Sequence, residues 1–159
     1  KEIDYLQKNL RILSGLYGVL KPLDLILPYR LEMGTALKNI KGKNLYVFWE
    51  NILTKHIVNE EKLTEKKSII NLASNEYFKA LDTKALKAKI ITPVFKDWSS
   101  GKYKVISFHA KKARGLMCRF MAQNNINKPE DLRDFNCENY HYDSSGSSEN
   151  ELVFLRKSA

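Results

Sequence analysis

The chain has 159 residues, of which 43% are hydrophobic and 28% charged, and its formal net charge at pH 7 is +9. These values are typical of one globular domain with a buried core, so we expect a single domain over residues 1–159. No apolar run approaches the roughly 18 residues of a membrane span, and no signal peptide precedes the first helical pattern, which favours a cytoplasmic protein. Because the chain begins with Lys1 rather than Met, we also expect a further segment upstream.

Cysteine and histidine are too few and too scattered to indicate a disulfide framework or a metal site. Cys118 and Cys137 form no C-x-x-C motif, and His56, His109 and His141 lack the spacing of zinc ligands. We therefore expect two reduced thiols, no metal and no cofactor.

The first part of the chain is expected to contain two helices separated by a glycine turn. Apolar residues at helical spacing follow Asp4 as far as Leu13, and Gly15 ends this helix. Gly15 to Gly18 forms a tight turn, after which Pro22 opens a second short helix. The backbone N–H groups of such a turn can hold a phosphate, as in helix-hairpin-helix DNA-binding motifs, although the spacing here is G-x-x-G rather than G-x-G.

Polar residues gather at two places in the middle of the chain. Residues 30–33 alternate polar and apolar, so a short strand would place Arg30 and Glu32 on one face, and residues 45–57 are a predicted helix. The second place is the corner where a predicted buried strand over residues 68–73 meets a helix. Such corners commonly bind anions or polar substrates. The polar side chains of this corner are those of Asn71, Ser74, Asn75 and Glu76. They could form either a structural hydrogen-bond network or a ligand pocket, and the sequence leaves both alternatives open.

The second half of the chain has clearer patterns. Strands over residues 90–95 and 103–108 flank a turn and form a predicted hairpin, and a helix is predicted over residues 109–124. A short helix from Pro129 and a strand pair around residues 140–142 and 152–155 complete the chain, which we assign to the α+β class: one compact domain with a mixed sheet and packed helices.

Basic residues concentrate between Lys84 and Arg119, where ten of them accompany a single acid, Asp97. This asymmetry favours a polyanionic partner. Lys111 and Arg114 fall on one flank of the apolar stripe of the predicted helix beside Gly115, which favours a phosphate or carboxylate site over a solvated basic face without excluding the latter. The cations assigned to nucleic-acid binding are Arg30, Lys104, Lys111, Lys112, Arg114 and Arg119.

Several longer motifs resemble the bacterial YaaA (DUF328, UPF0246) family. They are LSGLYGVL with PLD from Leu13, PYRLEMG from Pro28, Phe48-Trp49, NLASNEYF from Asn71, the pair Phe95 and Asp97, and AKKARG from Ala110. The resemblance runs from end to end of the chain but covers the later part of the family's length. It implies a compact α+β fold, a cytosolic role in peroxide stress linked to limiting iron damage, and DNA binding through a positively charged cleft with a helix-hairpin-helix-like element, which we place at Gly15 and Gly18. Cys118 is not expected as a family feature.

Two functions follow as hypotheses. In the first, the protein is not an enzyme and binds duplex DNA as a monomer, mainly through phosphates and with weak sequence specificity. In the second, it is an enzyme acting on a nucleobase or nucleotide in a polar pocket, with Glu32, Glu76 and Asp97 as candidate catalytic carboxylates.

Overall fold

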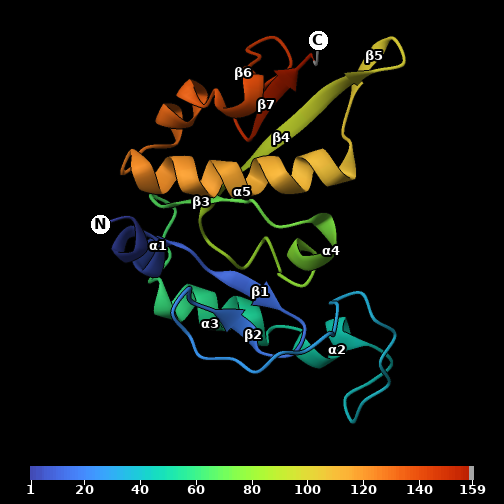
Figure 1. Ribbon diagram of the computed structural model, residues 1–159. Helices are drawn as coiled ribbons and strands as arrows, with labels where there is room; N and C mark the ends of the chain where they lie inside the picture. Colours follow the sequence, from blue (N-terminus) through green and yellow to red (C-terminus); the bar gives the residue numbers. More distant parts are fainter. Residues whose placement is uncertain (158–159) are drawn as a thin grey trace. The chain divides into compact units, whose positions relative to one another are not determined.

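Helices and strands occur in both halves of the chain, which confirms the predicted α+β class (Figure 1). The computed structural model describes residues 1–157, and the contacts between residues divide it into two units that are described separately. The N-terminal unit comprises Ile3–Lys67 and Ala73–Ala88, and the C-terminal unit comprises Ser68–Leu72 and the chain from Lys89 onward. The single domain expected over residues 1–159, of which 158–159 lie outside the described part, stays a prediction.

The N-terminal unit is built from short elements around a small apolar core. Its core consists of Met33, Leu45, Leu53 and Ala80, with the rings of Tyr46, Trp49 and Tyr77 packed against them. The elements are α1 (Glu2–Asn9), β1 (Ile12–Ser14), β2 (Gly18–Leu20), α2 (Leu45–Trp49), α3 (Ile52–Glu60) and α4 (Asn75–Phe78), and β1 and β2 pair as an antiparallel hairpin.

Three predictions for this unit are wrong. The first helix ends at Asn9, so the turn from Gly15 to Gly18 joins two strands rather than two helices, and no helix begins at Pro22. Residues 30–33 form no strand. The helix predicted over residues 45–57 is interrupted at Glu50, whose φ of 34° lies outside the helical region. Strands of three residues are too short to show alternation, which is why the pattern looked helical.

The C-terminal unit contains a mixed sheet whose strand order is β3-β4-β7-β6, with β5 pairing on β4. The pairs β3·β4 and β4·β7 are parallel, while β4·β5 and β6·β7 are antiparallel. The elements are β3 (Ser68–Ile70), β4 (Lys89–Ser99), β5 (Lys102–Lys104), α5 (Ser107–Gln123), the 3-10 helices η1 (Pro129–Asp134) and η2 (Cys137–Asn139), β6 (His141–Tyr142) and β7 (Glu151–Arg156).

The core of the C-terminal unit lies between this sheet and α5. Phe95 is 1% exposed and packs against the rings of Phe135, Tyr140 and Phe154. The apolar stripe of α5 contributes Ala113 and Met117 to the same cluster, as its helical spacing predicted. The predicted long helix, short helix at Pro129 and final strand pair are confirmed. The hairpin is confirmed as well, but its second strand is shorter than predicted, because β5 ends at Lys104 and residues 107–108 belong to α5.

Within residues 1–157 there is no helix with both the length and the apolar character needed to cross a bilayer.

Candidate functional site

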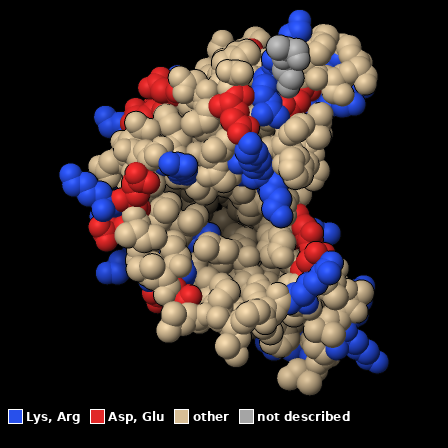
Figure 2. Space-filling model, viewed as in Figure 1, with Lys and Arg blue, Asp and Glu red and all other residues tan. Residues whose placement is uncertain are grey.

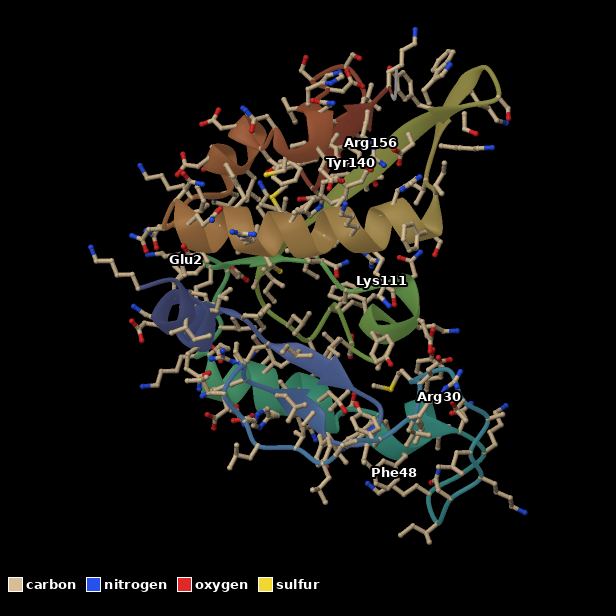
Figure 3. All side chains as sticks on the ribbon, viewed as in Figure 1. Glu2, Arg30, Phe48, Lys111, Tyr140 and Arg156 are labelled. Atoms are coloured by element: carbon tan, nitrogen blue, oxygen red, sulfur yellow. The ribbon has the colours of Figure 1, made fainter. Side chains whose placement is uncertain are left out.

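The charged side chains of helix α5 are all positive. Its 17 residues include four cations and no carboxylate, and Figure 2 shows Lys and Arg side chains over the first half of the helix. At about 100° per residue, Lys111 and Gly115 lie on the side of α5 opposite the buried residues Ala113 and Met117, and Arg114 lies on the flank between the two sides. Lys111 accordingly projects from α5 away from Tyr140 and Arg156 in Figure 3. We call Lys111, Arg114 and Gly115 the cationic face of α5.

The cations of α5 differ in their partners. Lys112 forms an ion pair with Glu138, whereas within residues 1–157 no carboxylate lies within ion-pair distance of Lys111, Arg114 or Arg119. Arg114 is half-buried, and among the residues that the structure describes its Nε donates only to the carbonyl oxygen of Ala110, at 3.2 Å. Burial lowers the pKa of Arg114, because the charged guanidinium is partly removed from water. A half-buried guanidinium without a counter-ion is suited to an anionic ligand.

Gly115 lies in open space. A Cβ added there meets no atom of the described residues within 4 Å, so no other part of the described chain approaches this glycine closely. A ligand beside Gly115 stays a prediction.

Cys118 follows on the same side of α5, one turn further on. Burial raises the pKa of its thiol, which favours the neutral thiol over the thiolate. Both Cys118 and Cys137 are free thiols. Among the residues described, no three His, Cys, Asp or Glu side chains come close enough to hold a metal ion.

Asp97, one of the candidate catalytic carboxylates, is 3% exposed and fully engaged. Its Oδ2 accepts from the Tyr140 hydroxyl at 2.9 Å, and its Oδ1 accepts from Arg156 Nε at 2.5 Å. Burial and then the hydrogen bond with Asp97 raise the pKa of Tyr140, which keeps the phenol neutral. Arg156 also pairs with Glu138, and these contacts support a structural role for Asp97.

Glu76, the second candidate carboxylate, ties two segments of the N-terminal unit together. Its Oε1 accepts from the backbone N–H of Gly34 at 2.7 Å, and its carbonyl oxygen accepts from the Tyr46 hydroxyl at 3.0 Å. A Cβ at Gly34 would lie 3.0 Å from Glu76 Oε1, so the glycine permits this close approach. Burial and then the Glu76 carboxylate raise the pKa values of Tyr46 and Tyr77.

The other predicted polar residues are more dispersed. Arg30, Glu32 and Asn75 are exposed in the N-terminal unit, where Ser74 precedes α4 without a side-chain capping bond. Asn71 belongs to the C-terminal unit, is buried, and donates to Thr92 Oγ1 at 3.4 Å. The predicted polar pocket thus takes residues from both units, and its formation stays a prediction.

Gly15 and Gly18 have structural reasons to be glycine. A Cβ at Gly15 would meet the carbonyl oxygen of Leu31 at 2.5 Å, and one at Gly18, where φ is +80°, would meet the Trp49 ring at 2.9 Å. The Trp49 indole also donates to the Gly15 carbonyl at 2.9 Å. These contacts account for both glycines, and their role in binding nucleic acid stays a prediction.

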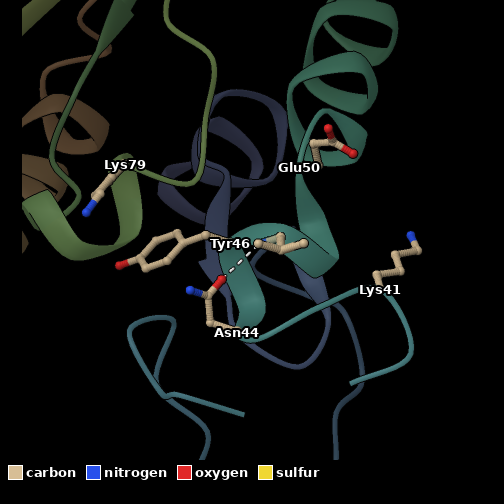
Figure 4. Close-up of a pocket in the computed structure, with 6 residues that line it drawn as sticks. Lys41, Asn44, Tyr46, Glu50 and Lys79 are labelled. Carbon is tan, nitrogen blue, oxygen red and sulfur yellow. Dashed lines mark hydrogen bonds between the residues drawn. The ribbon is translucent and has the colours of Figure 1, made fainter. Parts of the chain in front are cut away.

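A shallow pocket of about 790 Å³ opens beside α2 in the N-terminal unit and was not expected from the sequence (Figure 4). Two lysines border it, each against an aromatic ring: Lys41 Nζ lies 4.8 Å from the Phe48 ring centre and Lys79 Nζ lies 5.2 Å from that of Tyr46. Asn44, which also lines the pocket, caps α2 by accepting from the N–H of Val47 at 3.0 Å. No short motif connects these lysines, so only the fold identifies them.

Known proteins resemble this chain over almost all of its residues. The family described as peroxide stress protein YaaA matches residues 1–146. A UPF0246 protein of Neisseria meningitidis is 55% identical over 155 residues, which are 98% of this chain and 60% of that protein. A UPF0246 protein of Aliivibrio fischeri is 55% identical over 156 residues, with the same two shares. The chain thus spans 60% of the length of these curated relatives. The motifs and the matches agree, and the chain belongs to the family of peroxide stress protein YaaA.

Proposed function

We propose that this protein acts in the cytosol under peroxide stress by binding duplex DNA and limiting iron-linked oxidative damage to it. The observation that carries the proposal is the cationic face of α5, where Lys111 and Arg114 have no carboxylate partner among the described residues. Phosphates are the anions that such a face accepts most readily, and phosphate contacts carry little sequence information. Binding as a monomer with weak sequence specificity is part of the proposal.

The engaged carboxylates favour binding over catalysis. Asp97 accepts hydrogen bonds from Tyr140 and Arg156, and Glu76 accepts one from the backbone N–H of Gly34, so both carboxylates contribute to the fold. A plain anion-binding surface requires only the cations, whereas a general acid or base must also reach a substrate proton.

The proposal is tested with the full-length protein and a fluorescent duplex in a salt series. Removing one phosphate contact by Arg114→Ala should weaken binding about tenfold and reduce the slope of log affinity against log salt by about one. Lys128→Ala is the matched control, because it removes an equally positive but exposed side chain beyond the end of α5 and should change affinity less than threefold. Affinity that is independent of salt, or equal for the two variants, would refute the assignment to α5.

Protection is measured separately by exposing plasmid to ferrous iron and peroxide. The unmodified protein at saturating coverage should reduce strand breaks, and Arg114→Ala should restore them at the same concentration. Strand breaks that are unaffected by bound protein would contradict the protective part of the proposal.

A further inference from the structure

The hairpin of β4 and β5 exposes an aromatic pair on the outer face of the sheet. Trp98 and Tyr103 are directly opposite each other in the strand register, and their ring centres lie 5.0 Å apart at an interplanar angle of 72°. Side chains alternate along a strand, so Trp98 faces away from the core, to which Phe95 and Asp97 of the same strand point. Ser100 and Gly101, with φ of 53° and 79°, close the hairpin in a tight turn.

Lysines surround this pair. Lys96 shares the outer face of β4 with Trp98, two residues earlier, and Lys157 Nζ lies 5.4 Å from the Trp98 ring centre. Asp97, which lies between Lys96 and Trp98 in sequence, points to the other face of the sheet and pairs with Arg156. We call Lys96, Trp98, Tyr103 and Lys157 the aromatic-lysine patch.

Trp98 is 41% exposed, so a large aromatic side chain stays partly in contact with water although burying it would be favourable. The patch combines two rings with two lysines, whereas the apolar centre of a protein interface is depleted of lysine. Aromatic faces with flanking lysines are instead the composition of surfaces on which nucleobases stack.

We infer that the aromatic-lysine patch binds unpaired bases of a single-stranded nucleic acid, with the base stacked on Trp98 and the flanking phosphates paired with Lys96 and Lys157. The inference rests on the proposed function and adds a preference to it. In a duplex both faces of each base are covered by neighbouring bases, so Trp98 can stack only where the strand is open. The lysines, in contrast, serve phosphates of either form.

The test compares a fluorescent oligo(dT) of about 15 nucleotides with a duplex of the same length, using the full-length protein. Trp98→Ala should weaken oligo(dT) binding about tenfold and change duplex binding less than twofold. Trp98→Phe, which keeps an aromatic face, should retain most of the oligo(dT) affinity. Val105→Ala is the matched control, since Val105 is an exposed apolar residue without a ring and should have no effect.

Each outcome assigns the result to one cause. If the unmodified protein binds neither probe, the proposed function fails. If it binds the duplex normally while Trp98→Ala leaves oligo(dT) affinity unchanged, the stacking inference alone is overturned. An equal loss of affinity for both probes in Trp98→Ala also overturns it. A Trp98→Ala variant that changes its oligomeric state on size-exclusion chromatography but keeps its oligo(dT) affinity overturns it too, and would identify the patch as a protein interface. Quenching of Trp98 emission by oligo(dT), measured as the difference between the unmodified protein and Trp98→Phe, supports it.

Discussion

Asp97 is a carboxylate on the buried face of β4, and two side chains from distant parts of the chain hold it. Tyr140 and Arg156 are 43 and 59 residues away in sequence. The sequence near Asp97 gives no sign of these partners. Asp97 is an isolated acid in a basic segment, and for this reason it was a candidate catalytic group. Its side chain is 4% exposed and that of Arg156 is 12% exposed, which makes the pair part of the core of the C-terminal unit.

Removing this carboxylate should be costly. Asp97→Ala leaves the largely buried Arg156 without its partner, and we expect a loss of about 3–5 kcal/mol in the free energy of unfolding. Tyr140→Phe deletes one hydrogen bond to Asp97 and should cost about 1–3 kcal/mol. Urea unfolding measures both, with Asp134→Ala as the control because that aspartate is exposed. An Asp97→Ala variant as stable as the control would show that the network is not structural.

At the scale of elements, α5 combines a buried stripe with the cationic face. Ala113 and Met117 are 1% and 0% exposed, and this pattern over 17 residues made the helix the easiest element to predict. The strands β1 and β2 have only three residues each, which is too short for an alternation of apolar and polar residues to be recognised. The break between α2 and α3 depends on a single residue, Glu50, whose φ is positive. The long periodic helix was therefore predictable, whereas β1, β2 and the break at Glu50 were not.

Gly115 provides a test of what lies against this face. Alanine is more favourable than glycine inside a helix by about 1 kcal/mol, and its Cβ meets nothing within 4 Å, so Gly115→Ala should raise the melting temperature by about 2–4 °C. If DNA approaches the helix closely at this point, the same variant should bind duplex more weakly despite being more stable. Unchanged affinity would show that the phosphates lie beside Lys111 and Arg114 without crossing Gly115.

At the scale of the whole molecule, the motifs shared with the family are distributed over both units. The glycine turn, Trp49 and Glu76 belong to the N-terminal unit, whereas Asp97 and the cationic face of α5 belong to the C-terminal unit. Sequence patterns identified these residues because each lies in a motif that resembles the family. They did not reveal the parallel pairing of β4 with β7, whose register joins Asp97 to Arg156, because that pairing depends on contacts between remote segments.

The two hypotheses for the protein's role differ most at Glu76. Its carboxylate accepts from the Gly34 N–H, and a glutamine amide oxygen can accept the same bond, so Glu76→Gln should fold and bind DNA as the unmodified protein does. Glu76→Ala removes the acceptor and should lower the free energy of unfolding by about 1–2 kcal/mol. The pair of variants therefore separates the structural bond from any proton transfer.

Survival of cells under peroxide then decides between binding and catalysis. If the protein acts by binding DNA, Glu76→Gln should protect as well as the unmodified protein, because an amide satisfies Gly34 and removes a charge that repels phosphate. Arg114→Ala should protect poorly in the same assay, and thermal unfolding must show that both variants are folded. An enzyme that uses Glu76 as its base requires the opposite result, since an amide cannot take a proton. A Glu76→Gln variant that is stable, binds duplex and fails to protect would replace the binding proposal with a catalytic one.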